Sequence, residues 1–386
     1  MRRSPWLGLC FAIALGTIGC QDQSSSPTAP PVGSTPQSSL KSSSLYGLER
    51  GRIKLSAESR MSDQYLADLV RGAINPGDYV CSTATQVRSW LTAEVNKVDP
   101  DIFGLLYDDL LADLVVTYEA LLFQTEDTPQ YFGYNGEYTK VMLKTERDVK
   151  GFWDIRSDDI QLLGMHGTML LDEARVAATY SSFVFGVPPD DAALFASLIH
   201  DAILADPALN GGNHPIFTFN AFAFSSDVLP IEDKIVMGDG ILAGFAALGF
   251  GDVAPQAVYA HEFAHHIQYE NEYFDDDVPG ATTDAEFTRY TELMADAMAA
   301  YYLTHKRGGT MNQKRVEQFL QVYFQIGDCS FTNPGHHGTP NQRLAAARFG
   351  FEVADQAQKQ GHILTSEQFH ALFVTEYPAI VAPDAR

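Results

Sequence analysis

Residues 254–273 read APQAVYAHEFAHHIQYENEY. Apolar residues recur here at every third or fourth position, which predicts a largely buried helix, and Asp252 is a good N-cap for a helix over 253–273. His261 and His265 lie four positions apart, so on a helix both imidazoles project from one face. Two histidines without a ligand would be awkward in a buried helix, and the spacing therefore favours a shared ligand over a solvated pair.

A glutamate follows the first of these histidines directly, so residues 261–265 read H-E-F-A-H. Two imidazoles one helical turn apart can bind one zinc ion at the usual zinc–nitrogen distance of about 2.0–2.1 Å. Glu262 can then reach a water molecule at the open position of the metal, accept its proton and pass the proton to a leaving amine. The pattern H-E-x-x-H predicts a catalytic metal site, and the adjacent His266 points elsewhere.

A catalytic zinc site needs a third protein ligand. The nine residues after His265, HIQYENEYF, lack the glycine and histidine of the longer H-E-x-x-H-x-x-G-x-x-H pattern. Glu292 follows 27 residues after His265, and Asp296 lies one turn later on an otherwise apolar helical segment. Because a lone buried carboxylate is costly, we expect Glu292 to be the third ligand and Asp296 to accept a hydrogen bond from a ligating histidine. The alternative is an acidic pair on a helix surface.

The remaining chain predicts an α+β fold that is mainly α. The strand signals beside the histidine motif are residues 215–227, which are dense in Phe, and residues 234–238. A small sheet is therefore expected beside the helix that carries the histidine motif. Residues 128–155 are rich in Tyr, Phe and Gly and are interpreted as loops or short strands, and residues 160–186 are ambiguous. The predicted helices cover residues 62–74, 85–98, 101–123, 190–204, 238–252, 253–273, 285–305, 310–325 and 340–360.

The N-terminus has the pattern of an exported protein. Residues 1–19 combine two arginines, a short apolar run and a small residue at the end, as a secretory signal peptide does. Cys20 follows, and its placement resembles a bacterial lipobox, in which the cysteine is lipidated. The alternative is an ordinary cleaved signal with an incidental cysteine. Residues 20–45 are Ser/Pro-rich and predict a flexible tether. We expect a mainly helical region over 46–210 and the core with the histidine motif over 211–386.

Net charge and cysteine usage narrow the range of possible partners and sites. A formal net charge of −23 argues against nucleic acid as a partner, because its phosphates would be repelled. Cys81 and Cys329 could pair in an oxidising compartment or remain two buried thiols, and the sequence does not decide between these outcomes. Neither cysteine has the C-x-x-C spacing of a redox or zinc site.

These motifs together resemble the gluzincin metallopeptidases, and most closely the neutral zinc metallopeptidases of bacteria. The similar segments are HEFAHHIQ at 261–268, ELMADAMAAYY at 292–302 and HHGTPNQRLAAARFGF at 336–351, together with NAFAFSS at 220–226 and KIVMGDGIL at 234–242. The resemblance covers roughly residues 215–352. It does not cover the helical region before residue 200.

The resemblance implies a zincin-like core with one catalytic zinc ion bound by His261, His265 and Glu292, and Glu262 as general base and acid. It also implies a substrate-binding edge strand and a histidine that steadies the oxyanion of the tetrahedral intermediate. The edge strand corresponds to Asn220, Ala221 and Phe222. The oxyanion histidine corresponds to His337, with His336 as the alternative, and Arg343 is interpreted as structural.

The sequence thus predicts an exported zinc-dependent endopeptidase of a bacterial cell envelope. We expect it to be lipid-anchored at the outer membrane or cell surface, or otherwise periplasmic or secreted, with a peptide or protein as substrate and the membrane contacted through the lipid anchor. The alternative is a non-catalytic or latent zincin-like lipoprotein used for binding or assembly. Substrate specificity and oligomeric state are left open.

Overall fold

The computed structural model describes residues 85–225, 231–275, 278, 283–326, 338–358 and 361–383. Several sequence predictions fall on residues outside these ranges. They are the signal peptide 1–19, the Cys20 anchor with its tether to residue 45, the helix over 62–74, the cysteines Cys81 and Cys329, and the histidines His336 and His337.

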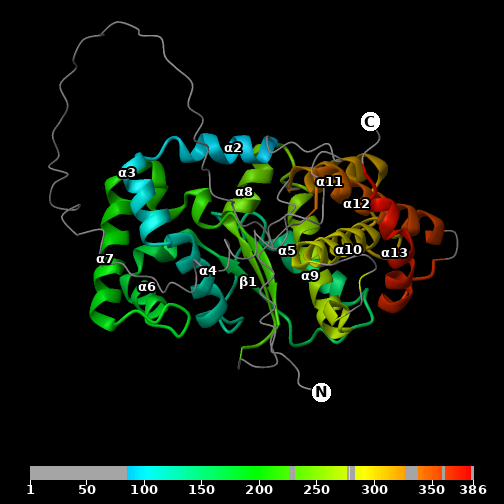
Figure 1. The fold of residues 1–386 in the computed structure, drawn as a ribbon, viewed down its shortest axis with the longest axis horizontal. Helices are drawn as coiled ribbons and strands as arrows, with labels where there is room; N and C mark the ends of the chain where they lie inside the picture. The colour runs from blue at the N-terminus through cyan, green and yellow to red at the C-terminus, as the bar shows by residue number, and fades with distance from the viewer. Residues whose placement is uncertain are drawn as a thin grey trace, which may run out of the picture.

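The described residues are mainly helical and contain one small mixed sheet (Figure 1). This agrees with the α+β, mainly α class expected from the sequence. The α-helices are α2 (Gln86–Val95), α3 (Pro100–Phe103), α4 (Ala112–Phe123), α5 (Thr139–Lys150), α6 (Glu173–Tyr180), α7 (Pro189–Ala205), α8 (Asp239–Ala247), α9 (Ala254–Glu270), α10 (Asp284–Thr304), α11 (Gln313–Ile326), α12 (Pro340–Gln358) and α13 (Ser366–Ile380). Within the described ranges, none of the helices is both long and apolar enough to cross a bilayer.

Three short strands form the sheet, in the order β1–β3–β2. They are β1 (Gln161–Met165), β2 (Ala221–Phe224) and β3 (Lys234–Gly238). The central strand β3 pairs in parallel with β1 and antiparallel with β2, so that Val236 lies opposite Leu163 on one side and Phe222 on the other. Strand β1 comes from the predicted N-terminal region and β3 from the predicted core, and the two regions therefore share one sheet.

Alternate strand residues feed two hydrophobic cores, because successive side chains of a strand point to opposite faces. Ile235 and Met237 of β3 join the core formed with α5, α9, α10, α12 and α13. Val236 joins the second core, together with Leu163 of β1 and Phe222 of β2, against α4, α6 and α7. Figure 1 shows the sheet between these two groups of helices. All five side chains are almost completely buried.

The outer edge of β1 is already bonded by side chains. The Leu162 N–H donates to Glu126 Oε1 at 2.6 Å, and the Gly164 N–H donates to Gln130 Oε1 at 3.0 Å. Lys150 Nζ donates to the Ile160 carbonyl just before the strand at 2.8 Å. These contacts satisfy backbone groups that a bare edge strand would expose.

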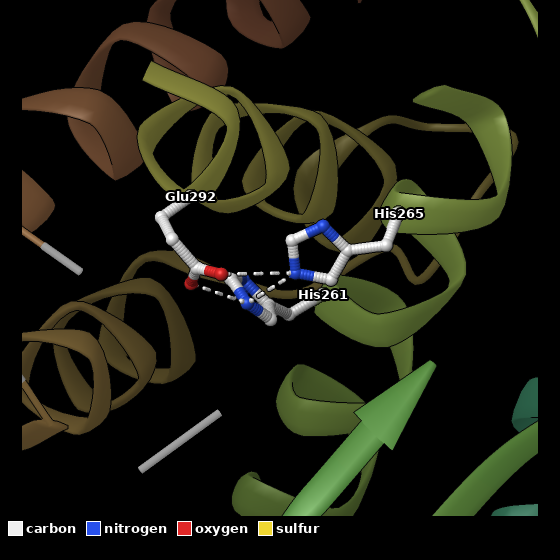
Figure 2. Close-up of side chains that lie close together, drawn as sticks. All are labelled: His261, His265 and Glu292. Carbon is white, nitrogen blue, oxygen red and sulfur yellow. Dashed lines mark hydrogen bonds and ion pairs between the residues drawn. The ribbon is translucent and has the colours of Figure 1, made fainter. Parts of the chain in front are cut away.

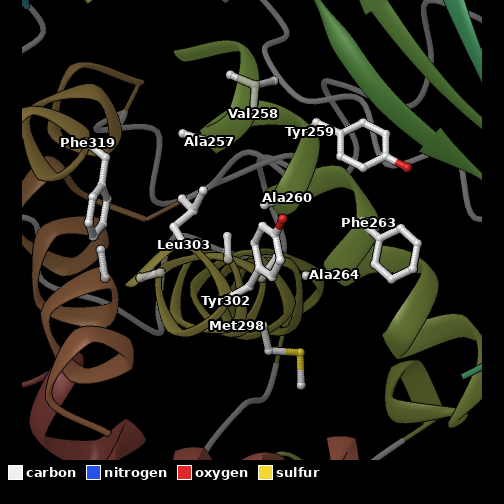
Figure 3. Close-up of a cluster of buried hydrophobic side chains, with 14 of the residues drawn as sticks. Ala257, Val258, Tyr259, Ala260, Phe263, Ala264, Met298, Tyr302, Leu303 and Phe319 are labelled. Carbon is white, nitrogen blue, oxygen red and sulfur yellow. The ribbon is translucent and has the colours of Figure 1, made fainter. Parts of the chain in front are cut away.

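Small residues allow α9, α10 and α12 to pack closely. Figure 3 shows Ala260 and Ala264 of α9 beside the buried side chains of α10, among them Tyr302. On the other side of α10, Gly350 of α12 lies so close that a Cβ there would be 2.1 Å from the Ala297 carbonyl oxygen. The alanine-rich sequence of α10 therefore reflects close helix contacts on two sides.

Two sequence interpretations are wrong. Residues 128–155, interpreted as loops or short strands, contain helix α5, which packs Met142 and Val149 into the core beside α9. The aromatic and glycine residues that suggested strands precede this helix. The expected N-cap Asp252 is also wrong, because Val253 caps α9 without a side-chain bond and Asp252 instead pairs with Arg315 at 2.8 Å.

Candidate metal centre

Three potential ligand side chains converge between α9 and α10 (Figure 2). His261 and His265 project from one face of α9, and their Nε2 atoms lie 3.2 Å apart. Glu292 reaches across from α10 and places one carboxylate oxygen 3.3 Å from His261 Nε2 and the other 3.4 Å from His265 Nε2. All three residues are at most 3 % exposed. The structure therefore brings together the three residues that the sequence nominated as ligands.

A polar side chain at the far side of each imidazole determines which nitrogen faces the centre. His261 Nδ1 lies 2.9 Å from Asp296 Oδ1, and a carboxylate can only accept. His265 Nδ1 lies 3.0 Å from Gln268 Oε1, while the amide nitrogen of Gln268 donates to the Thr291 carbonyl at 2.7 Å. Both Nδ1 atoms are thus placed to donate, which leaves the two Nε2 atoms as the ones that face a metal ion bound between them.

Arg343 of α12 holds Asp296 in place. Its Nε donates to Asp296 Oδ2 at 2.7 Å and its Nη2 donates to Asp296 Oδ1 at 2.6 Å. Nη2 also lies 3.9 Å from Glu292 Oε2. A bidentate pair of this kind fixes the carboxylate as well as neutralising it. Arg343 therefore has the structural position expected from the sequence.

The donor set fits a zinc ion. Three lone-pair donors this close repel one another unless a cation or a proton lies among them. Ligand atoms about 2.0 Å from a tetrahedral zinc ion lie about 3.3 Å from each other. The two imidazole Nε2 atoms lie 3.2 Å apart, and one ligand atom from each of the three residues lies within 4.8 Å of the others. Two imidazole nitrogens and a carboxylate are also a ligand combination that catalytic zinc sites use. The cluster can hold a metal ion, and the chemistry of its donor set is compatible with zinc.

The electrostatics of the cluster favour positive charge beside Asp296 and Glu292. Burial lowers the pKa of His261, but hydrogen bonds and charge from Asp296 and Glu292 outweigh it and raise this pKa to about 10. Burial lowers the pKa of His265 to about 4, although the charge of Glu292 acts in the opposite direction. His265 is therefore a neutral imidazole near pH 7, which is the form that binds metal.

The other predicted site residues are placed as follows. Glu262 is buried in α9 between the two histidines. Ala221 and Phe222 belong to β2, and the carbonyl of Asn220 accepts from the Gly238 N–H at 3.0 Å. The side chain of Phe222 faces the second core, whereas that of Ala221 faces the core that contains α9.

The predicted oxyanion residues, His337 and its alternative His336, lie outside the described residues. The first described residue after them is Gly338, which has a positive φ of 93°. A Cβ at Gly338 would lie 3.0 Å from Leu293 Cδ2, so this backbone packs against Leu293, the residue after Glu292 on α10.

Sequence reasoning missed two polar partners. Gln268 lies three residues after His265, and this helical spacing could have suggested that it orients the ring. The second is the partner of His166, whose Nδ1 lies 2.8 Å from Asp239 Oδ2. His166 and Asp239 follow directly after the parallel strands β1 and β3, so their proximity depends on a strand pairing that the local sequence does not reveal.

No family model, no curated protein and no solved structure matches this chain. The geometry of the cluster is therefore the basis for the functional inference.

Proposed function

We propose that His261, His265 and Glu292 bind one zinc ion and that the protein is a zinc-dependent endopeptidase. The observation that carries this proposal is the buried convergence of two imidazole nitrogens 3.2 Å apart with a carboxylate whose two oxygens lie 3.3 Å and 3.4 Å from them. A polar side chain lies behind each imidazole. Glu262 beside the cluster supports catalysis in addition to metal binding, because a structural zinc site has no need of a further buried carboxylate.

Each residue has a distinct role in peptide hydrolysis. Zinc in such a centre would supply Lewis acidity that polarises water and the peptide carbonyl. Glu262 accepts the proton of the attacking water and passes it to the nitrogen of the leaving amine. Asp296 keeps His261 in the tautomer that binds metal. His337, or His336, hydrogen-bonds the carbonyl oxygen as negative charge develops on it.

The edge strand β2 would hold the substrate in an extended conformation. The bond from Gly238 N–H to Asn220 O makes Asn220 a hydrogen-bonded partner of β3. Because bonding alternates along an antiparallel pair, the peptide groups of Ala221 and Ala223 point away from β3. A substrate backbone can add to the sheet there, next to α9, which packs against β2.

The test compares metal content and hydrolysis of wild type and Glu262→Gln. We expect one zinc per chain in both proteins, and a loss of about 10²–10⁴ in hydrolysis of an unstructured protein in the variant, as for removal of a general base. Glu270→Gln, which changes an exposed glutamate on the same helix, is the control and should remain active. A wild type without stoichiometric zinc, or a fully active Glu262→Gln, would contradict the proposal.

One observation favours a latent form as the second candidate. Glu262 and the three ligands are each at most 3 % exposed, whereas a substrate must reach them. In a latent or purely binding protein, zinc would be bound but wild type and Glu262→Gln would be equally inert on a broad peptide library. Hydrolysis by wild type would exclude this candidate.

Cys20 and the preceding segment support a further proposal, that the protein is exported and lipid-anchored in a bacterial envelope. In an expressing bacterium, a labelled fatty acid should be incorporated into wild type and not into Cys20→Ser. Equal labelling of the two proteins would contradict the anchor.

A further inference from the structure

Arg289 is a second buried arginine, after Arg343 of α12. It lies on α10, one turn before the proposed ligand Glu292. Arg289 is 6 % exposed. Its Nε and Nη1 atoms have no hydrogen-bond partner, and no carboxylate of the described residues forms an ion pair with it. Burying a guanidinium without an anion is costly, and proteins ordinarily avoid it. The arrangement therefore calls for an anion from elsewhere.

The contrast with Arg343 shows what is missing. Both arginines are buried, but Arg343 makes two short bonds to Asp296. Arg343 thereby has its charge compensated and its conformation fixed. Arg289 has the same planar donor set for a carboxylate, and its Nε and Nη1 donors are unused within the described part of the chain.

Helix geometry places Arg289 near the metal. Residues three apart on a helix are neighbours, with about 5–6 Å between their Cβ atoms, so Arg289 lies beside Glu292. It is also one turn before Leu293, against which Gly338 packs. Helical side chains lean toward the helix N-terminus, so the guanidinium lies on the N-terminal side of the cluster. An extended peptide advances about 3.3–3.6 Å per residue, and a group one or two residues from the scissile bond can span this distance.

We propose that Arg289 binds a carboxylate of the substrate, one or two residues from the scissile bond. This inference rests on the proposed peptidase function and adds its substrate class. The carboxylate can be the free C-terminus of a peptide or the side chain of Asp or Glu, and both offer the same bidentate acceptor. With a formal net charge of −23 the whole protein repels anions, so this selectivity must come from a local cation.

The first test measures hydrolysis of matched peptides by the full chain. One pair differs in a free or amidated C-terminus, and a second pair has Glu or Gln next to the scissile bond. We expect wild type to favour one carboxylate member by about 10- to 100-fold in kcat/KM, the range of a hydrogen bond to a charged group. Arg289→Met should abolish the preference and Arg289→Lys should keep part of it. Arg348→Met, at an exposed arginine of α12, should leave it unchanged.

Two readouts do not depend on turnover. Because Arg289→Met removes an uncompensated buried charge, it should raise the melting temperature of the metal-free protein by about 2–4 °C. Calorimetry with a peptide hydroxamate should show tighter binding of the free acid than of the amide, or of the Glu form than of the Gln form, in wild type and not in Arg289→Met.

The outcomes separate the two proposals. Equal handling of acidic and neutral peptides by an active, zinc-loaded wild type would overturn the role of Arg289 and leave the peptidase proposal standing. A lower melting temperature of Arg289→Met would also overturn it, because the arginine would then have an internal partner. A wild type that neither binds zinc nor hydrolyses any peptide would overturn the proposed function, and this inference with it.

Discussion

At the scale of single residues, the carboxylate of Asp296 connects the cluster to the rest of the fold. It orients His261 and is itself held by Arg343. We expect Asp296→Asn to weaken zinc binding by about 10- to 100-fold, because partners behind a ligand usually contribute this much. The variant also leaves Arg343 free to attract Glu292, which lies 3.9 Å away.

Zinc affinity can be measured by competition with a chelating dye. Asp252→Asn, at an exposed carboxylate before α9, is the matched control and should bind zinc as wild type does. An unchanged zinc affinity in Asp296→Asn would show that the contact does not orient the ligand.

A second single-residue prediction concerns pH. Burial raises the pKa of Asp113, in the first turn of α4, to about 6, although a backbone hydrogen bond from Leu114 acts in the opposite direction. Its usual pKa is 3.8, so between these values the folded state binds more protons than the unfolded state. The contribution of protonated Asp113 to the free energy of unfolding is fully present below about pH 4 and is lost as the pH rises through about 6.

Removing this titration should stabilise the protein at neutral pH. The free energy of unfolding of Asp113→Asn minus that of wild type should be larger at pH 7 than at pH 4, by up to about 3 kcal/mol. Urea denaturation at the two pH values measures the difference. If wild type and variant have parallel pH profiles, the carboxyl group does not titrate as described.

At the scale of elements, local sequence patterns predicted some features and missed others. Strand β3 and helix α7 lie almost where apolar alternation and helical periodicity placed them. Helix α5 was missed because aromatic and glycine residues before it suggested strands. The three ligands could be nominated because their spacing is local to two helices. The contact of His166 with Asp239 could not be predicted in this way, because it depends on two strands that are paired across more than seventy residues.

Contacts between helices yield a further prediction at this scale. Gly350→Ala places a Cβ against the Ala297 carbonyl of α10, so α12 must move away from it. We expect a loss of about 1–3 kcal/mol in free energy of unfolding, as for other overpacked sites. Gly104→Ala is the control, since its Cβ would meet nothing closer than 3.9 Å. Thermal denaturation compares the two, and equal melting temperatures would contradict the close contact.

At the scale of the whole molecule, the sheet joins both hydrophobic cores. Adjacent β3 residues such as Ile235 and Val236 belong to different cores, so neither core can separate without breaking the strand. We expect the described part of the chain to unfold in a single thermal transition. Zinc should raise and a chelator should lower the temperature of that whole transition, because a ligand that binds the folded state stabilises it.

Differential scanning calorimetry measures this coupling. The control is magnesium, which prefers oxygen ligands and should have little effect on a site with two imidazoles. Two separate transitions, with zinc moving only one of them, would show that the cores are independent.

The bonded outer edge of β1 determines which edge of the sheet can accept a further strand. The N–H groups of Leu162 and Gly164 are occupied by Glu126 and Gln130, so a further strand cannot dock there without displacing them. Any extended segment that joins this sheet is directed to β2, whether it is a substrate, an inhibitor or a second copy of the protein. Self-association through strands and peptide binding would therefore be mutually exclusive, and a peptide bound along β2 would block association of two copies through this edge.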